Sequence, residues 1–339
     1  MSAAAPDLDL SKVAERMCIA LGRGALASIE RLTGGKNNRV YQINFAGDEK
    51  LVLKGYHADP RDPRDRLAAE WDFLTYVWQR GVRSVPEPLL QDKAAHAAIY
   101  TFAPGRKLGA AEIAQSHIDQ AADFILAANG PPRAVDLLRP GSEACFSLAN
   151  HVATVDRRTA RLSSLDGTAP HRDRAETLVR ERLKPAWAEA RARIVSDPGY
   201  GDALELGQQI ASPSDFGFHN ALVDPSDRAI FIDFEYAGRD DPAKLVSDFF
   251  CCPEIPVPLK FRAGFVESLA RNLGLDNAFR RRADLLLDAY RIKWTCIVLN
   301  DFLPLGAARR DFAESGEREA RCLAQLDKAA AKLDEIGQI

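Results

Sequence analysis

The stretch SPSDFGFHNALVDPSDRAIFID, residues 212–233, decides how this chain is interpreted. Two short apolar runs, ALV and AIFI, flank the turn residues DPSD, a pattern typical of a β-hairpin. Such a hairpin would place Asn220 and Asp233 together at the open ends of its two strands. Because magnesium prefers hard oxygen ligands together with waters and phosphates, these two side chains predict a metal site, with Asp215 close beside it.

Residues 171–173 read His-Arg-Asp, the letters of the catalytic loop in protein kinases. In that loop an Asn five residues after the Asp holds a metal ion, and position 178 here is Leu. The residues after Asp173 follow a helical period. We therefore predict that Asp173 begins a helix, where acidic side chains are favoured.

Residues 215–217 read Asp-Phe-Gly, the letters of the kinase magnesium motif. If Asp215 is instead the catalytic residue that accepts a hydroxyl proton, Asn220 follows at the required spacing and Asp233 takes the metal role. The structural alternative is that Asp215 caps a turn and Asp233 ends a strand in a salt bridge. We favour the metal site because residues 229–232 predict a strand buried on both faces, and a carboxylate delivered there needs a partner.

Together with FIDFEYAGRDDPAKLVSDFF (residues 231–250), this stretch resembles the aminoglycoside phosphotransferase and choline kinase family, over residues 25–305. That family has His-x-Asp-x-x-x-x-Asn, then Ile-Asp-(Trp/Phe)-Glu, then Asp-Pro and a further Asp. The matching residues here are Asp215, Asn220, Asp233, Phe234, Glu235, Asp241, Pro242 and Asp248. One departure is Pro213, which replaces the family His and puts the packing of the loop in question.

The resemblance implies an α+β, bilobal protein-kinase-like fold. Three antiparallel strands are predicted in residues 25–56, a helix in 66–81 and two strands in 87–102. Strand signals nearly vanish after Ala103-Pro104-Gly105. We therefore expect a nucleotide-binding lobe over 1–102 and a catalytic, substrate-binding lobe over 103–339. Helices are expected in the second lobe at 109–130, 143–165, 172–195, 241–250, 258–272 and 277–336.

The first lobe tests the resemblance, which implies a Lys on the third strand paired with a Glu on the following helix. Lys54 follows Leu51-Val52-Leu53, and Glu70 lies on the apolar stripe of its helix. The alternatives are an exposed strand-end lysine and a glutamate at the rim of the helix. We favour a Lys54–Glu70 pair that grips nucleotide phosphates.

The sequence evidence for other parts of a nucleotide site is weaker than the evidence for the Lys54–Glu70 pair. Gly34 and Gly35 lie between the first two strands, where a phosphate-covering turn belongs, although an ordinary hairpin turn explains them equally well. The segment lacks Gly-x-Gly-x-x-Gly and also fails as a P-loop. Phe102 and Ala103 are candidates for the hinge whose backbone would bond adenine.

The acceptor pocket would be built by the C-terminal helices. Within the run DAYRIKWTCIVLNDF, residues 288–302, Lys293 could bind an anionic substrate. Asp301, in the same run, or Asp248 could bind a cationic one. We regard solvated helix-face charges or structural salt bridges as the better explanation for each of them. Arg291, Trp294 and Asn300 lie in the same run.

Composition limits the class of protein. The chain has 339 residues with 46% hydrophobic and 27% charged side chains, and its net charge of -3 argues against nucleic acid as a partner. Its six cysteines show no zinc-ligand spacing, which is typical of reduced thiols. Asp7 and Asp9 disfavour a signal peptide, and no stretch reaches the length of a membrane span. We expect a cytoplasmic protein without a membrane partner; its oligomeric state is left open.

The sequence thus predicts a small-molecule kinase that uses ATP and Mg²⁺ and phosphorylates a hydroxyl, with a sugar or amino alcohol preferred. The alternatives are an aminoglycoside antibiotic phosphotransferase and a catalytically silent ATP-binding regulatory module, the latter motivated by Pro213 and the unusual glycine segment. A protein-directed kinase is disfavoured, because no Ala-Pro-Glu follows Asp233.

Overall fold

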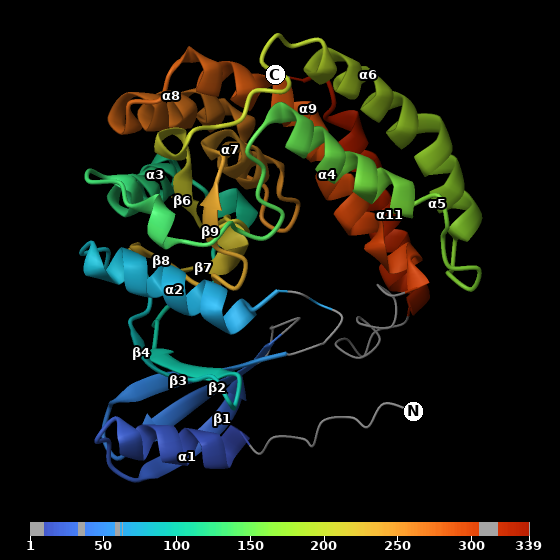
Figure 1. Ribbon diagram of the computed structural model, residues 1–339. Coiled ribbons are helices and arrows are strands. Elements are labelled where there is room, and N and C mark those ends of the chain that lie inside the picture. Colours follow the sequence, from blue (N-terminus) through green and yellow to red (C-terminus); the bar gives the residue numbers. More distant parts are fainter. Residues whose placement is uncertain (1–9, 33–37, 58–61, 63, 305–317, 339) are drawn as a thin grey trace.

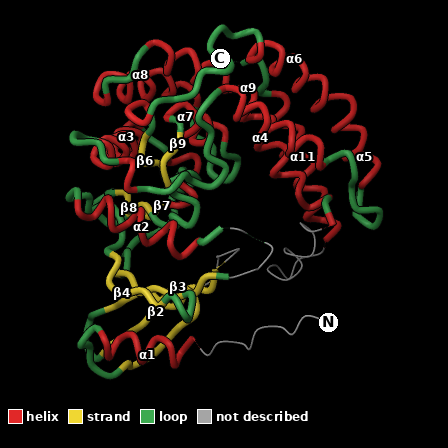
Figure 2. The backbone as a smooth tube through the Cα atoms, viewed as in Figure 1, coloured by secondary structure: helices red, strands yellow, loops and turns green. Residues whose placement is uncertain are grey.

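The structure, a computed structural model, describes residues 10–32, 38–57, 62, 64–304 and 318–338. A sheet-bearing part and a larger, mostly helical part are clearly separated in Figures 1 and 2. This arrangement confirms the predicted α+β, bilobal fold. The division into 1–102 and 103–339 as functional domains stays a prediction.

The first part is built on a five-stranded antiparallel sheet of order β1-β2-β3-β5-β4. All five strands fall where the sequence predicts them. They are β1 (Leu26–Leu32), β2 (Asn38–Phe45), β3 (Lys50–Tyr56), β4 (Pro88–Asp92) and β5 (Ala97–Thr101). The predicted Gly34 and Gly35 lie between β1 and β2 but outside the described residues.

Helices cover both faces of this sheet, α1 (Leu10–Ala20) on one and α2 (Arg66–Gln79) on the other. Since successive strand residues point to opposite faces, Leu51 and Leu53 pack with α1, whereas Lys54 and Tyr56 face α2. The sequence analysis did not predict α1. Its apolar residues recur at helical spacing, so the signal was present.

The second part contains the remaining helices and two small two-stranded sheets, β6 with β9 and β7 with β8. Its longer helices are α3 (Gln115–Asn129), α4 (Leu148–Arg161), α5 (Arg172–Leu178), α6 (Lys184–Val195), α7 (Pro242–Cys251), α8 (Arg262–Leu273), α9 (Asn277–Val298) and α11 (Arg318–Asp334). Its strands are β6 (Ile210–Ser212), β7 (Ala221–Val223), β8 (Ala229–Phe231) and β9 (Gly238–Asp240). No helix in the described part of the chain is long and apolar enough to cross a membrane.

Two predictions about helices need comment. The helical structure predicted over 277–336 is divided among the described residues into α9, which ends at Val298, a short 3₁₀ turn, Leu299–Phe302, and α11, which begins at Arg318. The prediction that Asp173 begins a helix is confirmed, since Asp173 lies in the first turn of α5. The residue that caps this helix is His171, whose backbone is left-handed with φ 58°.

The hydrophobic core explains why α2 is firmly placed against the helical part. One cluster joins α1 to the sheet, and a second, larger cluster joins α2 to the helical part. Phe73 of α2 stacks on Phe234, the residue after Asp233, with ring centroids 5.0 Å apart. The core therefore fixes Glu70, one turn away on α2, relative to the predicted metal residue.

Candidate active site

The predicted hairpin forms and gathers the predicted residues. β7 and β8 pair antiparallel, and the ladder continues beyond them, with the Ile232 N–H donating to the Asn220 carbonyl at 2.9 Å. The Asn220 side-chain amide donates to the Asp215 carbonyl oxygen at 3.0 Å. Asp215, Asn220 and Asp233 therefore belong to one compact segment, as the sequence predicts.

The loop that presents Asp215 is well packed in spite of Pro213. The Asp215 N–H donates to the Pro213 carbonyl at 2.9 Å, which closes a three-residue turn around Ser214. Phe216 is buried and stacks on Phe249 with centroids 4.9 Å apart. The doubt that Pro213 raised about the packing of this loop is therefore removed.

Three non-glycine residues of this region have left-handed backbone, one of which is Asp227 in the hairpin turn with φ 60°. Ser214 has φ 64° and Asp233 has φ 67°. Such a conformation costs about 1–3 kcal/mol for a residue other than glycine and persists only where the surroundings enforce it. Two of these three strained positions lie in the turns that present Asp215 and Asp233.

Lys54 links the two parts of the molecule. Its Nζ lies 2.6 Å from Glu70 Oε2 and 2.5 Å from Asp233 Oδ1. Burial alone would lower the pKa of Lys54, but the neighbouring carboxylates of Asp233 and Glu70 outweigh it and raise this pKa. The lysine is therefore held as a cation within β3.

Glu70 is buried on α2 and makes a second polar contact. The Tyr56 hydroxyl donates to its Oε2 at 2.9 Å, and that hydroxyl lies 2.6 Å from the hydroxyl of Tyr100. Burial raises the pKa of Glu70, while the Lys54 ammonium opposes the shift. The sequence predicts the Lys54–Glu70 pair correctly. It does not predict the contacts of Tyr56 and Tyr100, both of which lie on the face of the sheet that packs against α2.

Glu235 forms a further contact between the two parts. Its side chain is buried, accepts a hydrogen bond from the Asn38 amide at the start of β2, and lies 3.9 Å from Arg66 Nε. The sequence analysis placed Glu235 in the family pattern but did not predict Asn38 or Arg66 as partners. No local pattern connects residues so distant in the chain.

His219 is another residue that the sequence analysis did not single out. Its Nε2 lies 3.3 Å from Asp215 Oδ1. Burial of the ring would lower its pKa, but the hydrogen bonds to Asp215 and Cys252 raise the pKa of His219 to about 10. The Asp215 carboxylate thus faces a donor within its own loop.

The residues present fit a magnesium ion. Asp233 is 41% exposed, and Lys54 contacts one of its two oxygens. The amide nitrogen of Asn220 is engaged by Asp215, which leaves the amide oxygen to bind a cation. Within the described ranges no three His, Cys, Asp or Glu side chains gather as a metal site. That is compatible with magnesium, which needs few protein ligands because it keeps waters and binds substrate phosphates.

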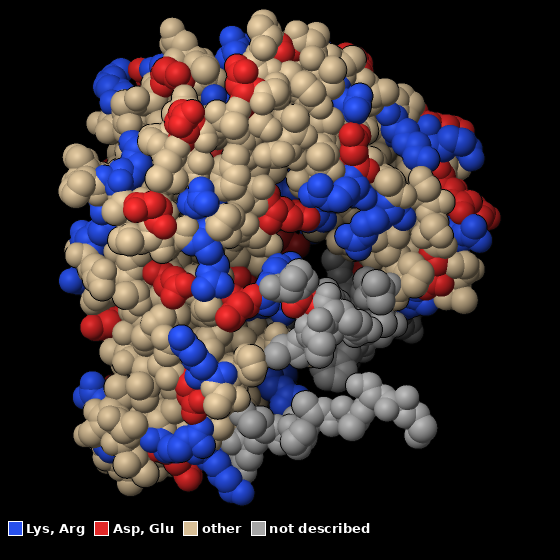
Figure 3. All heavy atoms as spheres, in the orientation of Figure 1, with Lys and Arg blue, Asp and Glu red and all other residues tan. Residues whose placement is uncertain are grey.

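One prediction about Asp233 is wrong in detail. The strand before it is not buried on both faces, since Ile230 and Ile232 are only half-buried. The carboxylate of Asp233 is correspondingly open rather than desolvated. In Figure 3 the surface is hollowed near the centre of the view, and Lys, Arg, Asp and Glu side chains gather along the wall.

The predicted hinge residues follow β5 directly. Phe102 and Ala103 are both half-buried, and Lys50 lies over the Phe102 ring at 5.6 Å from its centroid. Their role in binding adenine stays a prediction.

Most of the residues predicted to bind the acceptor make ion pairs or hydrogen bonds within the protein. Lys293 pairs with Asp248 at 2.6 Å, and the Trp294 indole donates to the same carboxylate at 2.9 Å. Arg291 is buried and pairs with Asp288 at 2.8 Å. Asp301 is buried, and Asn300 is half-buried. The structural salt bridges that the sequence analysis preferred for Lys293 and Asp248 are present.

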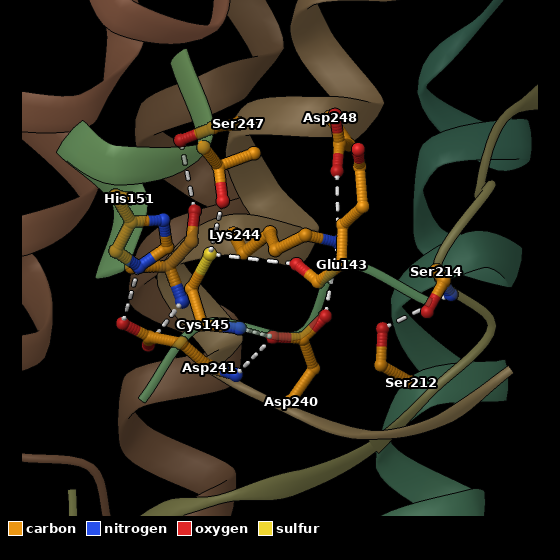
Figure 4. Close-up of polar contacts among 12 residues, drawn as sticks. Glu143, Cys145, His151, Ser212, Ser214, Asp240, Asp241, Lys244, Ser247 and Asp248 are labelled. Carbon is orange, nitrogen blue, oxygen red and sulfur yellow. Dashed lines mark hydrogen bonds and ion pairs between the residues drawn. The ribbon is translucent and has the colours of Figure 1, made fainter. Parts of the chain in front are cut away.

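A buried ionic network lies in the helical part (Figure 4). Lys244 reaches Asp240 at 2.9 Å and Asp248 at 3.3 Å. Asp241 binds Arg282 at 3.0 Å and His151 at 3.2 Å. Asp241 also accepts a hydrogen bond from Ala243 N and so caps α7. Each of these buried carboxylates has a cationic side chain beside it, which compensates the cost of burying its charge. The network therefore has the character of a structural element.

Fold and site together define a phosphotransferase with a protein-kinase-like fold. The profile of the phosphotransferase enzyme family matches residues 28–285 of this sequence. The chain therefore belongs to that family, and it is a phosphotransferase. This finding confirms the resemblance noted in the sequence.

Solved structures show the same fold. A choline/ethanolamine kinase family protein from Mesorhizobium loti is 22% identical, with a TM-score of 0.55 over 96% of this chain and 99% of that one. Plasmodium vivax ethanolamine kinase is 13% identical, with a TM-score of 0.59 over 98% and 92%. A spectinomycin phosphotransferase in complex with ADP and spectinomycin is 12% identical, with a TM-score of 0.62 over 95% and 98%. A comparison with curated proteins gave no match.

Proposed function

We propose that this phosphotransferase transfers the γ-phosphoryl group of ATP to a hydroxyl of a small metabolite, and that it requires Mg²⁺. The observation that supports the proposal most strongly is the position of Lys54, which contacts Glu70 at 2.6 Å and Asp233 at 2.5 Å. This is the arrangement that phosphoryl transfer in kinase-like folds requires. The structural neighbour solved with ADP supports ATP as the donor.

Each residue has a distinct role in the proposed reaction. Asp215 orients the acceptor hydroxyl and accepts its proton, while Lys54 neutralises charge on the phosphates. Glu70 holds Lys54 in place. Asn220 and Asp233 would hold Mg²⁺, which when bound neutralises phosphate oxygens. Catalysis rests mainly on positioning and electrostatic stabilisation.

A sugar or amino alcohol is the preferred acceptor. Two of the neighbours named above are ethanolamine or choline/ethanolamine kinases, which supports an amino alcohol, and the third acts on an antibiotic. Fold alone does not choose among them. The enzyme is assigned to the cytoplasm, which the six buried free thiols support.

The test is an assay with Mg²⁺, ATP and a panel of choline, ethanolamine, sugars and aminoglycosides. One acceptor should speed ATP consumption and yield a phosphorylated product detectable by mass. Asp215→Asn should lower turnover by about 10²–10⁴-fold, because general-base catalysis contributes on that order. Nucleotide affinity should remain nearly unchanged in calorimetry.

Two outcomes would contradict the proposal. If ATP stabilises the protein thermally but no acceptor is phosphorylated, the chain is a silent nucleotide-binding module. If Asp215→Asn keeps full turnover, Asp215 is not the base.

A further inference from the structure

The His219 ring lies between the Asp215 carboxylate and a buried thiol. Its Nε2 is 3.3 Å from Asp215 Oδ1, and its Nδ1 is 3.5 Å from Cys252 Sγ. The ring is mostly buried, and Cys252, at the end of α7, is only 1% exposed. Both ring nitrogens therefore have a fixed partner.

The proton on this ring can be placed from its partners. An ionised carboxylate only accepts hydrogen bonds, so Nε2 must carry a proton for the contact with Asp215, whether the ring is neutral or charged. The contact between Nδ1 and Cys252 Sγ at 3.5 Å fixes the orientation of the ring in which Nε2 faces Asp215.

Gly217 gives this ring its space. A Cβ at position 217 would lie 2.7 Å from His219 Nδ1, closer than real Cβ atoms come, and 3.0 Å from Cε1, so the ring would have to shift. The φ of Gly217 is 173°, which is extended backbone open to any residue. A glycine is therefore needed at this position because the His219 ring lies so close to it, and not because of the backbone conformation of the glycine.

The backbone of His219 is also held. Lys107, in the segment after β5, donates from Nζ to the His219 carbonyl at 2.7 Å. Pro213, on the other side of Asp215, has neither an N–H nor a polar side chain to offer the carboxylate. His219 is the donor that the loop supplies instead.

We propose that His219 is a positioning residue that binds Oδ1 of Asp215 through Nε2–H and leaves Oδ2 to accept the proton of the acceptor hydroxyl. Cys252 fixes the orientation of the ring, and Gly217 makes room for it. The inference rests on the proposed role of Asp215 as the base.

The kinetic test uses full-length protein and the hydrolysis of Mg·ATP with water as acceptor. His219→Leu removes the donor and should lower kcat by about a hundredfold, the order of loss expected when a catalytic group is misplaced. KM for ATP should stay nearly unchanged. His219→Gln retains an N–H donor of similar reach and should recover most of the rate.

The matched control is His171→Leu. His171 also has a carboxylate partner, Glu319 at 3.7 Å, but it lies at the start of α5 and should leave both kinetic constants unchanged. The inference is overturned if His219→Leu turns over like this control, or if His219→Gln is as slow as His219→Leu. If Asp215→Asn itself keeps full turnover, the proposed function fails instead.

A second test needs no activity. In the ¹⁵N spectrum of the nucleotide-free protein, the His219 signal, assigned by its loss in His219→Gln, should report a proton on Nε2. A ring protonated on Nδ1 alone overturns the proposal.

Gly217→Ala gives an independent check, because its Cβ displaces the ring without removing the imidazole. It should slow turnover in the wild-type background and add little to His219→Leu, since both changes break the same contact. Fully additive losses would contradict the proposal.

Discussion

Two ionic networks lie close together in this protein, and they differ in exposure. At the active site, Asp233 and Asp215 are 41% and 33% exposed. In the network of Figure 4, Asp240 and Asp248 are 0% and 2% exposed and are bound by buried lysines. Both sets contain carboxylates beside cations. The first has carboxylate oxygens left open for ligands, whereas the second is compensated internally.

This difference in exposure distinguishes ion pairs that can bind ligands from ion pairs that stabilise the fold. A buried ion pair that loses one partner leaves an uncompensated charge, so its removal is expected to affect folding. An open ion pair can instead exchange its partner for a substrate or a cation. Substitutions in the two networks should therefore change different measured quantities.

Among changes to the ion pairs, the largest effect on turnover is expected at Lys54. Lys54→Met should lower kcat by about 10²–10³-fold, the loss typical of removing one preorganised electrostatic contact. Lys93→Met, at an exposed lysine in the turn between β4 and β5, is the control and should leave kcat unchanged. Equal rates for the two variants in the Mg·ATP assay would show that Lys54 has no catalytic role.

The next effect is expected in the buried network. Lys244→Met should lower the free energy of unfolding by about 3–5 kcal/mol, as measured by urea denaturation, because Asp240 then lacks its cation. Adding Asp240→Asn should restore part of this loss, since it removes the stranded charge. An unfolding free energy equal to that of the wild type would show that the pair is not structurally important.

The smallest effect concerns pH and His151. Burial would lower its pKa, but nearby Cys145 and the hydrogen bond to Asp241 raise the pKa of His151 from 6.5 to about 10. A folded pKa above the unfolded one means that the stabilisation is complete below pH 6.5 and is lost as pH rises toward 10. The thermal unfolding temperature of the wild type should therefore fall more steeply over this range than that of His151→Gln. Parallel curves for the two proteins would contradict this assignment.

Much of the site could be predicted because its signals are local. The turn residues between two apolar runs fix the β7–β8 hairpin, and the hairpin in turn brings Asn220 beside Asp233. The alternation of side chains along β3 points Lys54 toward α2, where Glu70 interrupts an apolar stripe. The helix α1 also has a local signal, apolar residues at helical spacing, but the sequence analysis did not predict it.

Other contacts could not be predicted because they join distant parts of the chain. Glu235 meets Asn38 across the two parts of the molecule, and His219 meets Cys252 from the far end of α7. Nor does the sequence show that Lys293 neutralises Asp248, which removes both from the acceptor candidates.

The sequence by itself determined the identity and spacing of the groups proposed to bind and react, because hairpins and strands follow from short-range patterns of side chains. Tertiary structure alone decided which carboxylates are left open and which are neutralised. That outcome depends on how burial and long-range packing distribute charge, and neither is encoded in any single stretch of the chain.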